Sequence, residues 1–211
     1  MYVKIILDFF YKFFYNKKKQ ERMYNLNFEG PLRDITHNYS YKNKVFILDE
    51  LTVENTSRLL ADIAEMIEYE KKHTHTIEWF FNSPGGEVQA CKSLLSMMKF
   101  ANIQDVTNIT YVIGTAASSA SMLAIHGNDR YMLSYASHYI HYGSSGNSSS
   151  HPSEALRNYK DDQIFYKWVF NSYLEHTNIP KDKLEQLMEH EGGFLYAKDC
   201  LKYKLVDHVI D

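Results

Sequence analysis

The sequence predicts an α/β fold with a largely parallel sheet, and two observations support this prediction. Short runs rich in β-branched and aromatic residues alternate with longer segments whose apolar residues recur at helical spacing. Two of the short runs also end in small-residue turns that lead directly into a helical segment. This alternation is typical of βαβ units, in which parallel strands are joined by helices.

The first half of the chain carries the clearest elements. Runs rich in β-forming residues predict strands, and apolar residues three or four positions apart predict helices. Strands are expected at 44–48, 77–81 and 109–113, and helices at 53–72, 87–100 and 116–126.

The last third of the chain differs in character. Short strands are expected at 131–133 and 138–142, followed by a flexible polar segment at 143–150. A long helix is expected at 153–176, and another helix begins at Pro180. The long helix carries more apolar residues than one core-facing side needs. It therefore favours a projecting helix at an oligomer interface, with an ordinary core helix as the alternative.

Composition sets the broad class of the protein. With 211 residues, 45% of them hydrophobic and 23% charged, the chain is typical of one globular domain. Its formal net charge of −3 gives no electrostatic case for a nucleic-acid partner. Cys91 and Cys200 form no metal-binding motif and fit a reducing compartment. We therefore expect a cytoplasmic protein with no metal and no other cofactor.

The N-terminal stretch is expected to be separate from the folded domain. We assign 1–24 as an extension or leader and 25–211 as the domain. Residues 1–15 are mostly apolar but too few to span a membrane, and basic residues follow them. Three interpretations remain open: an amphipathic segment that packs on a partner or a membrane surface, a removable leader, or an upstream extension with Met23 as the true start.

The motif Pro84-Gly85-Gly86 lies between a predicted strand and a predicted helix. An oxyanion hole needs backbone N–H groups that face a developing negative charge, with no side chain blocking the approach. Two glycines at the start of a helix supply such groups, and the helix dipole favours an anion there. Pro-Gly-Gly alone predicts only a turn. The prediction of an oxyanion hole therefore rests on the position of the motif between a strand and a helix.

The turn at Gly114–Ala120 places Ser118 between a predicted strand and a predicted helix, among small residues. Such a turn suits a nucleophilic serine, because substrate must reach the hydroxyl group. On spacing alone Ser119 and Ser121 are rivals. A small-residue helix that packs closely on a neighbour is the structural alternative.

His141 follows the apolar pair Tyr139-Ile140 and stands just before a glycine-containing loop. An imidazole at the end of a strand can reach across a cleft and take a proton from a serine. The histidines at 126, 138 and 151 are competitors for this role. An oxyanion hole, a nucleophile and a base together predict a serine peptidase.

From about Lys44 to Asp211 the chain resembles the ClpP-like serine peptidases, which are the proteolytic subunits of the Clp protease. The matching motifs agree in order and spacing. They are Asn82–Gly86, Gly114–Ser118, Ile140-His141, Phe194–Ala197 and Leu205–Asp207. The resemblance implies an α/β fold of the ClpP/crotonase type, with a projecting helix for ring stacking.

The resemblance also implies a role for each motif. Ser118 takes the place of the family's nucleophile and His141 that of its base, while Gly86 and Ser119 supply the oxyanion-hole amides. The implied function is a serine endopeptidase that cleaves unfolded polypeptides or peptides inside a chamber. Its subunits would form a heptameric ring, stacked in pairs as a tetradecamer. A separate AAA+ unfoldase would supply any ATP dependence, since the chain has no Walker-type phosphate loop.

The chain departs from the family pattern at one important place. The aspartate that orients the histidine usually stands just before the Phe-Leu pair, and by alignment Gly192 takes its position here. The nearest acid is Glu191, which could serve if the loop shifts. Loss of the orienting acid typically costs about 10⁴-fold in rate, so a slow enzyme and an inactive one are both open.

Smaller departures occur at Ser119, Tyr142, Gly143 and Lys204, and none of them removes a catalytic group. If Lys204 is left-handed, it costs about 1 kcal/mol relative to glycine.

Four alternatives to the chambered peptidase remain open. Three share its fold: a phage-type capsid or head maturation protease, a catalytically degenerate ring subunit and a crotonase-type acyl-CoA enzyme. The fourth is a serine–lysine peptidase similar to signal peptide peptidases. Substitution of His141 separates the serine–histidine peptidase from the acyl-CoA enzyme and the serine–lysine peptidase.

Overall fold

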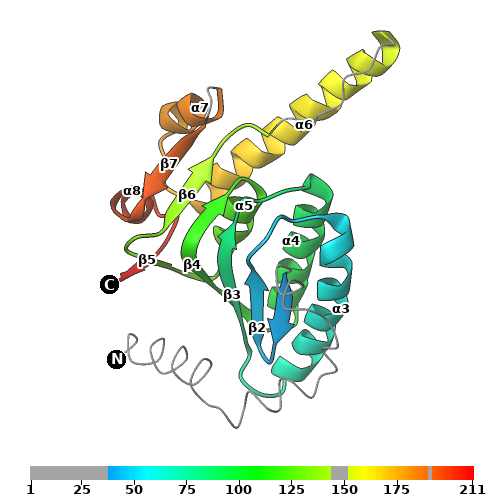
Figure 1. Ribbon diagram of the computed structural model, residues 1–211, viewed down its shortest axis with the longest axis vertical. Helices are drawn as coiled ribbons and strands as arrows, with labels where there is room; N and C mark the ends of the chain where they lie inside the picture. The colour runs from blue at the N-terminus through cyan, green and yellow to red at the C-terminus, as the bar shows by residue number, and fades with distance from the viewer. Residues whose placement is uncertain (1–37, 144–151, 190–191) are drawn as a thin grey trace, which may run out of the picture. The chain divides into compact units, whose positions relative to one another are not determined.

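The computed structural model describes residues 38–143, 152–189 and 192–211 (Figure 1). The predicted extension at 1–24 and its boundary at residue 25 lie outside these residues. So do Glu191 and all but the first residue of the predicted polar segment at 143–150. These remain predictions.

The described strands form one sheet. They are β1 (Tyr39–Tyr41), β2 (Lys44–Ile47), β3 (Thr76–Ser83), β4 (Thr107–Ala117), β5 (Asp129–Leu133), β6 (Ser137–Ile140), β7 (Gly193–Tyr196) and β8 (His208–Ile210). Along the main path the order is β1-β2-β3-β4-β5-β8, and neighbouring strands from β2 to β5 are parallel. β1 pairs antiparallel with β2. The predicted α/β fold with a largely parallel sheet is therefore confirmed.

The sheet divides along β4. Ile109–Val112 pairs in parallel with β5, whereas Thr115–Ala117 pairs in parallel with β6. β7 then pairs antiparallel with β6. The helix expected at 116–126 was predicted to begin too early. Residues 115–117 are still held in the sheet by β6, and the helix begins only at Ser119.

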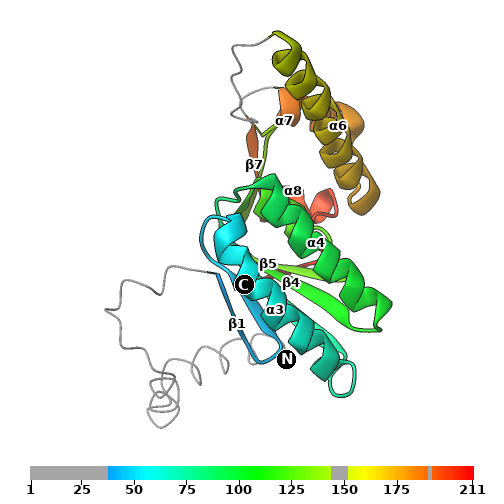
Figure 2. The same cartoon turned by 90° about the vertical axis from the view of Figure 1, so that its right-hand side faces the viewer.

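Six helices surround this sheet in the described part of the chain. They are α3 (Val53–Glu70), α4 (Val88–Ile103), α5 (Ser119–Ala124), α6 (Pro152–His176), α7 (Lys181–Glu189) and α8 (Ala197–Lys202). α3 and α4 lie side by side over one face of the sheet (Figure 2). α3 begins with a capping box: the Thr52 hydroxyl accepts from the Asn55 N–H at 3.1 Å, and the Asn55 side chain accepts from the Thr52 N–H at 3.0 Å.

Side chains of the central strands alternate between two faces. Val45, Ile47, Trp79 and Phe81 are fully buried in the core that α3 and α4 cover. The indole of Trp79 donates to the side-chain oxygen Oδ1 of Asn108 at 2.9 Å, so its one polar group is satisfied inside the core.

The opposite face of the sheet carries a row of stacked rings, one from each strand of the main path. Neighbouring centroids are 4.5–5.1 Å apart. The rings belong to Tyr39, Phe46, Phe80, Tyr111, Tyr131 and His208. Cross-strand aromatic pairs stabilise a sheet beyond their buried area, so this row helps to fix the strand register.

The long helix α6 has two different halves. Its C-terminal half packs on the core through Val169, Phe170 and Tyr173, which are buried. Its N-terminal half runs beyond the edge of the sheet (Figure 1), and Tyr159 and Ile164 there are 62% and 68% exposed. A projecting helix was predicted, and its exposed apolar surface is what an oligomer interface requires.

No helix in residues 38–143, 152–189 or 192–211 is long and apolar enough to cross a membrane. Both cysteines are free and buried. Lys204 has a φ of 58°, so the left-handed conformation considered for it is the observed one.

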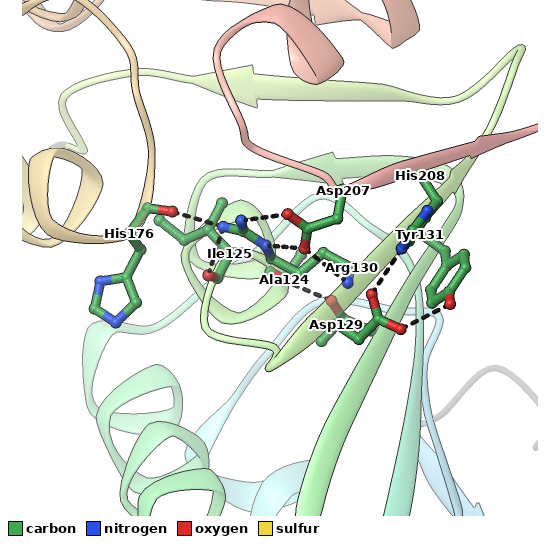
Figure 3. A network of polar contacts seen from close by, with 9 residues as sticks. Ala124, Ile125, Asp129, Arg130, Tyr131, His176, Asp207 and His208 are labelled. Atoms are coloured by element: carbon green, nitrogen blue, oxygen red, sulfur yellow. Dashed lines mark hydrogen bonds and ion pairs between the residues drawn. The ribbon is translucent and has the colours of Figure 1, made fainter.

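One guanidinium joins three segments that are distant in the sequence (Figure 3). Arg130 at the start of β5 donates to both carboxylate oxygens of Asp207, at 2.9 and 3.0 Å. It also donates to the backbone carbonyl of His176, at the end of α6, at 2.6 Å. These hydrogen bonds hold the pKa of Asp207 below its usual value.

We expect Arg130→Ala to lower the free energy of unfolding by about 1 to 3 kcal/mol, because a partly buried carboxylate then loses its partner. Urea denaturation at neutral pH measures the change. Lys181→Ala is the control, since its ion pair with Glu185 is exposed and is expected to contribute less than about 0.5 kcal/mol. Equal effects of the two substitutions would contradict the structural role of Arg130.

Candidate active site

A cavity of about 490 Å³ lies where the β3–α4 turn meets the end of β4. Its lining includes all four residues predicted for the site: Gly86, Ser118, Ser119 and His141. They come from three separate parts of the chain, and the sheet brings them together because β3, β4 and β6 are neighbours. The carboxyl ends of parallel strands are where α/β proteins commonly place their sites.

The Pro84-Gly85-Gly86 turn is held from both sides. The Ser83 hydroxyl donates to the Asp49 carbonyl at 2.6 Å and accepts from the Gly85 N–H at 3.1 Å. Leu51 donates its N–H to the Gly85 carbonyl and accepts from the Glu87 N–H, each at 2.7 Å. The turn is thus rigid before any substrate binds, as an oxyanion hole requires.

Glycine is required at both positions, because other parts of the chain lie too close to leave room for a Cβ. Gly85 has a φ of 89°, and a Cβ there would lie 2.8 Å from the Ser118 Cβ and 2.9 Å from the Ser119 nitrogen. Gly86 has a φ of 144°, and a Cβ there would lie 2.2 Å from the Leu51 carbonyl oxygen. Only glycine lets this turn lie directly against the serine turn.

Ser118 occupies an unusual backbone conformation, with φ 53° and ψ −123°. A non-glycine residue rarely adopts a positive φ, and such outliers cluster at functional sites. The Ser118 N–H donates to the Tyr139 carbonyl at 2.9 Å, which ties the turn to β6. Nucleophilic serines of α/β hydrolytic enzymes stand on a comparably sharp strand-to-helix turn.

The hydroxyl groups of the two rival serines, Ser119 and Ser121, already make hydrogen bonds with other residues. The Ser119 hydroxyl donates to the Gly86 carbonyl at 2.7 Å. Ser121 is fully buried, accepts from the Tyr173 hydroxyl at 2.8 Å and contacts His138 Nδ1 at 2.9 Å. Of these three serines, Ser118 alone lines the cavity without an intramolecular hydrogen bond from its hydroxyl within the described residues.

The amides of Gly86 and Ser119 are available to a ligand. Neither N–H donates a hydrogen bond to any described residue, although the neighbouring Gly85, Glu87 and Ser118 amides all do. A backbone N–H that borders a cavity without a partner can bind an anionic oxygen.

His141 lies just past the end of β6 and lines the same cavity. Its ring is partly buried, and burial lowers its pKa below the ordinary value of 6.5. The imidazole is therefore neutral at neutral pH and able to accept a proton. No hydrogen bond between Ser118 and His141 is present among the described residues. This is common in unliganded sites, where catalytic hydrogen bonds often tighten only on substrate binding.

Two of the histidines that compete with His141 for the role of base are buried or partly buried away from the cavity. His138 is fully buried, and burial lowers its pKa to about 3. His126 contacts the Met122 carbonyl at 2.6 Å and the Ser172 hydroxyl at 3.1 Å, so both ring nitrogens are used. Neither lines the cavity. His151 lies outside the described residues.

The loop where the family places its orienting aspartate does approach His141. A Cβ on Gly192 would lie 2.7 Å from the His141 Cβ. Position 192 is therefore adjacent to the imidazole, as the alignment implied, but it brings no side chain.

The remainder of the cavity was not predicted from the sequence. Most of it is apolar and comes from helices α4, α5, α6 and α7, including Met122, Phe165, Trp168, Val169, Tyr173 and Met188. Lys92 also lines the cavity, with its ammonium 5.3 Å from the centre of the Trp168 ring. Helical spacing marked several of these residues as apolar, but no sequence signal shows that α6 folds back over the serine turn.

Cys91 also borders the cavity, but it is a poor candidate for a nucleophile. Burial raises the pKa of its thiol to about 12, which keeps it protonated. The thiol lies 3.6 Å from the Ser119 carbonyl oxygen, as expected of a small packing residue.

Comparison with known proteins shows the family of this chain. Residues 29–211 match the Clp protease family. The ATP-dependent Clp protease proteolytic subunit of Deinococcus radiodurans is 31% identical over 137 residues, which cover 64% of this chain and 65% of that subunit. Proteolytic subunit 1 of Mycobacterium tuberculosis is 28% identical over 168 residues, covering 79% of this chain and 80% of the relative. The chain belongs to the Clp protease family, whose members include these Clp-type proteolytic subunits.

Proposed function

We propose that this protein is an active serine endopeptidase with Ser118 as nucleophile and His141 as general base. The observation that carries the proposal is the convergence of four features on one cavity. These are a serine on a strained turn, a neutral imidazole and the two unpartnered amides of Gly86 and Ser119.

The mechanism follows from these positions. The Ser118 hydroxyl oxygen attacks the peptide carbonyl carbon while His141 takes its proton, and the Gly86 and Ser119 amides stabilise the oxyanion. The intermediate collapses as the imidazolium gives its proton to the leaving amine, which breaks the C–N bond. Water, deprotonated by His141, then attacks the acyl-enzyme and releases the carboxylic acid product.

We further propose that the subunits assemble into a chamber, a heptameric ring that can stack as a tetradecamer in the cytoplasm. The projecting half of α6, with Tyr159 and Ile164 exposed on it, supports such an assembly. The relatives are named as proteolytic subunits of an ATP-dependent protease, which supports a separate AAA+ unfoldase that delivers unfolded polypeptides. In this proposal residues 25–211 form the peptidase domain, and residues 1–24 are an extension or leader.

Labelling with a fluorophosphonate probe tests the assignment of the nucleophile and the base. We expect Ser118→Ala to abolish labelling and His141→Ala to slow it by about 10³- to 10⁴-fold, because an unactivated serine is a weak nucleophile. Ser96→Ala and His73→Ala, at exposed sites on α4 and after α3, serve as controls and are expected to label normally. An assembled wild-type protein that takes no label would identify a degenerate subunit instead.

The pH dependence of labelling tests the protonation state of His141. The neutral imidazole is the active form, so the rate rises with pH through the pKa of His141 and then levels off. Because burial lowers that pKa below 6.5, we expect more than half of the maximal rate at pH 6.5. A half-maximal rate well above pH 6.5 would argue against His141 as the base.

The apolar cavity predicts the residue preferred before the cleaved bond. Peptides with Leu or Phe at that position should have a kcat/KM about 10-fold higher than those with Glu or Lys, because most of the cavity wall is apolar, although Glu50, Lys92, Asp161 and Asp162 also line it. Trp168→Ala should reduce this preference. Ile164→Ala, on the exposed part of α6, is the control. Equal cleavage of all four peptides would refute this assignment of the cavity.

A further inference from the structure

The imidazole of His141 has a close neighbour in the space where an orienting acid would be expected. A Cβ built on Gly192 would lie 2.4 Å from the Tyr139 hydroxyl oxygen and 2.7 Å from the Tyr139 Cζ. The same Cβ would lie 2.7 Å from the His141 Cβ. The phenol therefore occupies the space that a side chain at position 192 would enter on its way to the imidazole.

The backbone of the Gly192 loop is adapted to this arrangement. Gly192 has a φ of 91°, a conformation that L-residues rarely adopt. An aspartate there would be strained and would also clash with the phenol. The glycine and the tyrosine are thus complementary: position 192 carries no side chain where the ring of Tyr139 lies.

Tyr139 is held in this place from several directions. It pairs with Phe194 across β6 and β7, and their ring centroids are 4.7 Å apart. Its ring lies 5.3 Å from the His141 ring, and its backbone carbonyl accepts the Ser118 N–H at 2.9 Å. One residue therefore contacts both the turn of the nucleophile and the ring of the base.

We propose that Tyr139 is the positioning residue for His141, taking the place of the orienting aspartate; this inference rests on the proposed serine peptidase function. The phenol oxygen accepts the hydrogen of one imidazole nitrogen and leaves the other nitrogen free to take the Ser118 proton. A small rotation of either ring brings the two groups together when substrate binds. A neutral phenol stabilises the imidazolium less than a carboxylate does, so a site that relies on Tyr139 works more slowly than one with an aspartate.

Tyr139→Phe removes the hydroxyl and keeps the ring. We expect the labelling rate and kcat for peptides to fall about tenfold with KM unchanged, because the hydrogen bond acts on the transition state. A hydrogen bond to the imidazolium favours the charged form, so its loss lowers the pKa of His141. The midpoint of the pH–rate profile should therefore move to lower pH. Tyr135→Phe, at a residue 99% exposed, is the matched control.

A second variant at the same position separates positioning from packing. Tyr139→Ala removes the hydroxyl and the ring, whereas Tyr139→Phe removes the hydroxyl alone. A positioning role predicts that both substitutions slow labelling, and a packing role predicts that only Tyr139→Ala does. Thermal melting confirms that each variant is folded.

Two results would overturn the inference while the peptidase function stands. One is wild-type labelling with an unshifted pH profile in Tyr139→Phe, and the other is a full loss of rate in Glu191→Ala with Tyr139→Phe unaffected. If the wild-type protein takes no label, the function fails and the inference is decided by ¹⁵N NMR of the histidine rings. A changed tautomer ratio of His141 in Tyr139→Phe, absent in Tyr135→Phe, supports the contact, and an unchanged ratio refutes it.

Discussion

The site depends on the pairing of one long strand. β4 has 11 residues, and it pairs with β3 along most of its length, with β5 in its middle and with β6 at its end. β6 pairs with β4 up to Ala117, the last residue of the strand, so the chain turns sharply at Ser118 directly after a segment held in the sheet. The pairing with β6 also places His141 beside this turn. The hydrogen-bond ladder that stabilises the sheet thus sets the relative positions of Ser118 and His141, the proposed nucleophile and base.

A second constraint is the contact between two turns. Gly85 lies so close to Ser118 and Ser119 that a single methyl group would separate them. The same contact, reinforced by the hydrogen bond from Ser119 to the Gly86 carbonyl, leaves two amides unpartnered at the cavity. In the proposed mechanism substrate supplies the missing acceptor, so the energy of satisfying these donors is available when the oxyanion forms.

Much of the fold could be predicted because strong local patterns agree with the tertiary structure. The strands at 44–48 and 77–81 and the helix at 53–72 were placed within a few residues, since their apolar residues do face the core. Predictions failed where pairing overrides local preference. Ala116 and Ala117 read as the start of a helix, yet β6 holds them in the sheet. The short β7, α8 and β8 carry too few residues for a periodic pattern and were not predicted.

The sequence by itself determined the fold class, the family and the residue types of the site, because motifs such as Asn82–Gly86 require particular backbone geometry and particular chemistry. It left three serines and four histidines as rivals. Only the tertiary structure decided where these groups lie: Ser121 and His138 are buried against each other, whereas Ser118 and His141 border one cavity. It also decided which residue occupies the space beside the imidazole. Contacts such as that of Tyr139 with Gly192 join positions far apart in the chain, and local sequence carries no information about them.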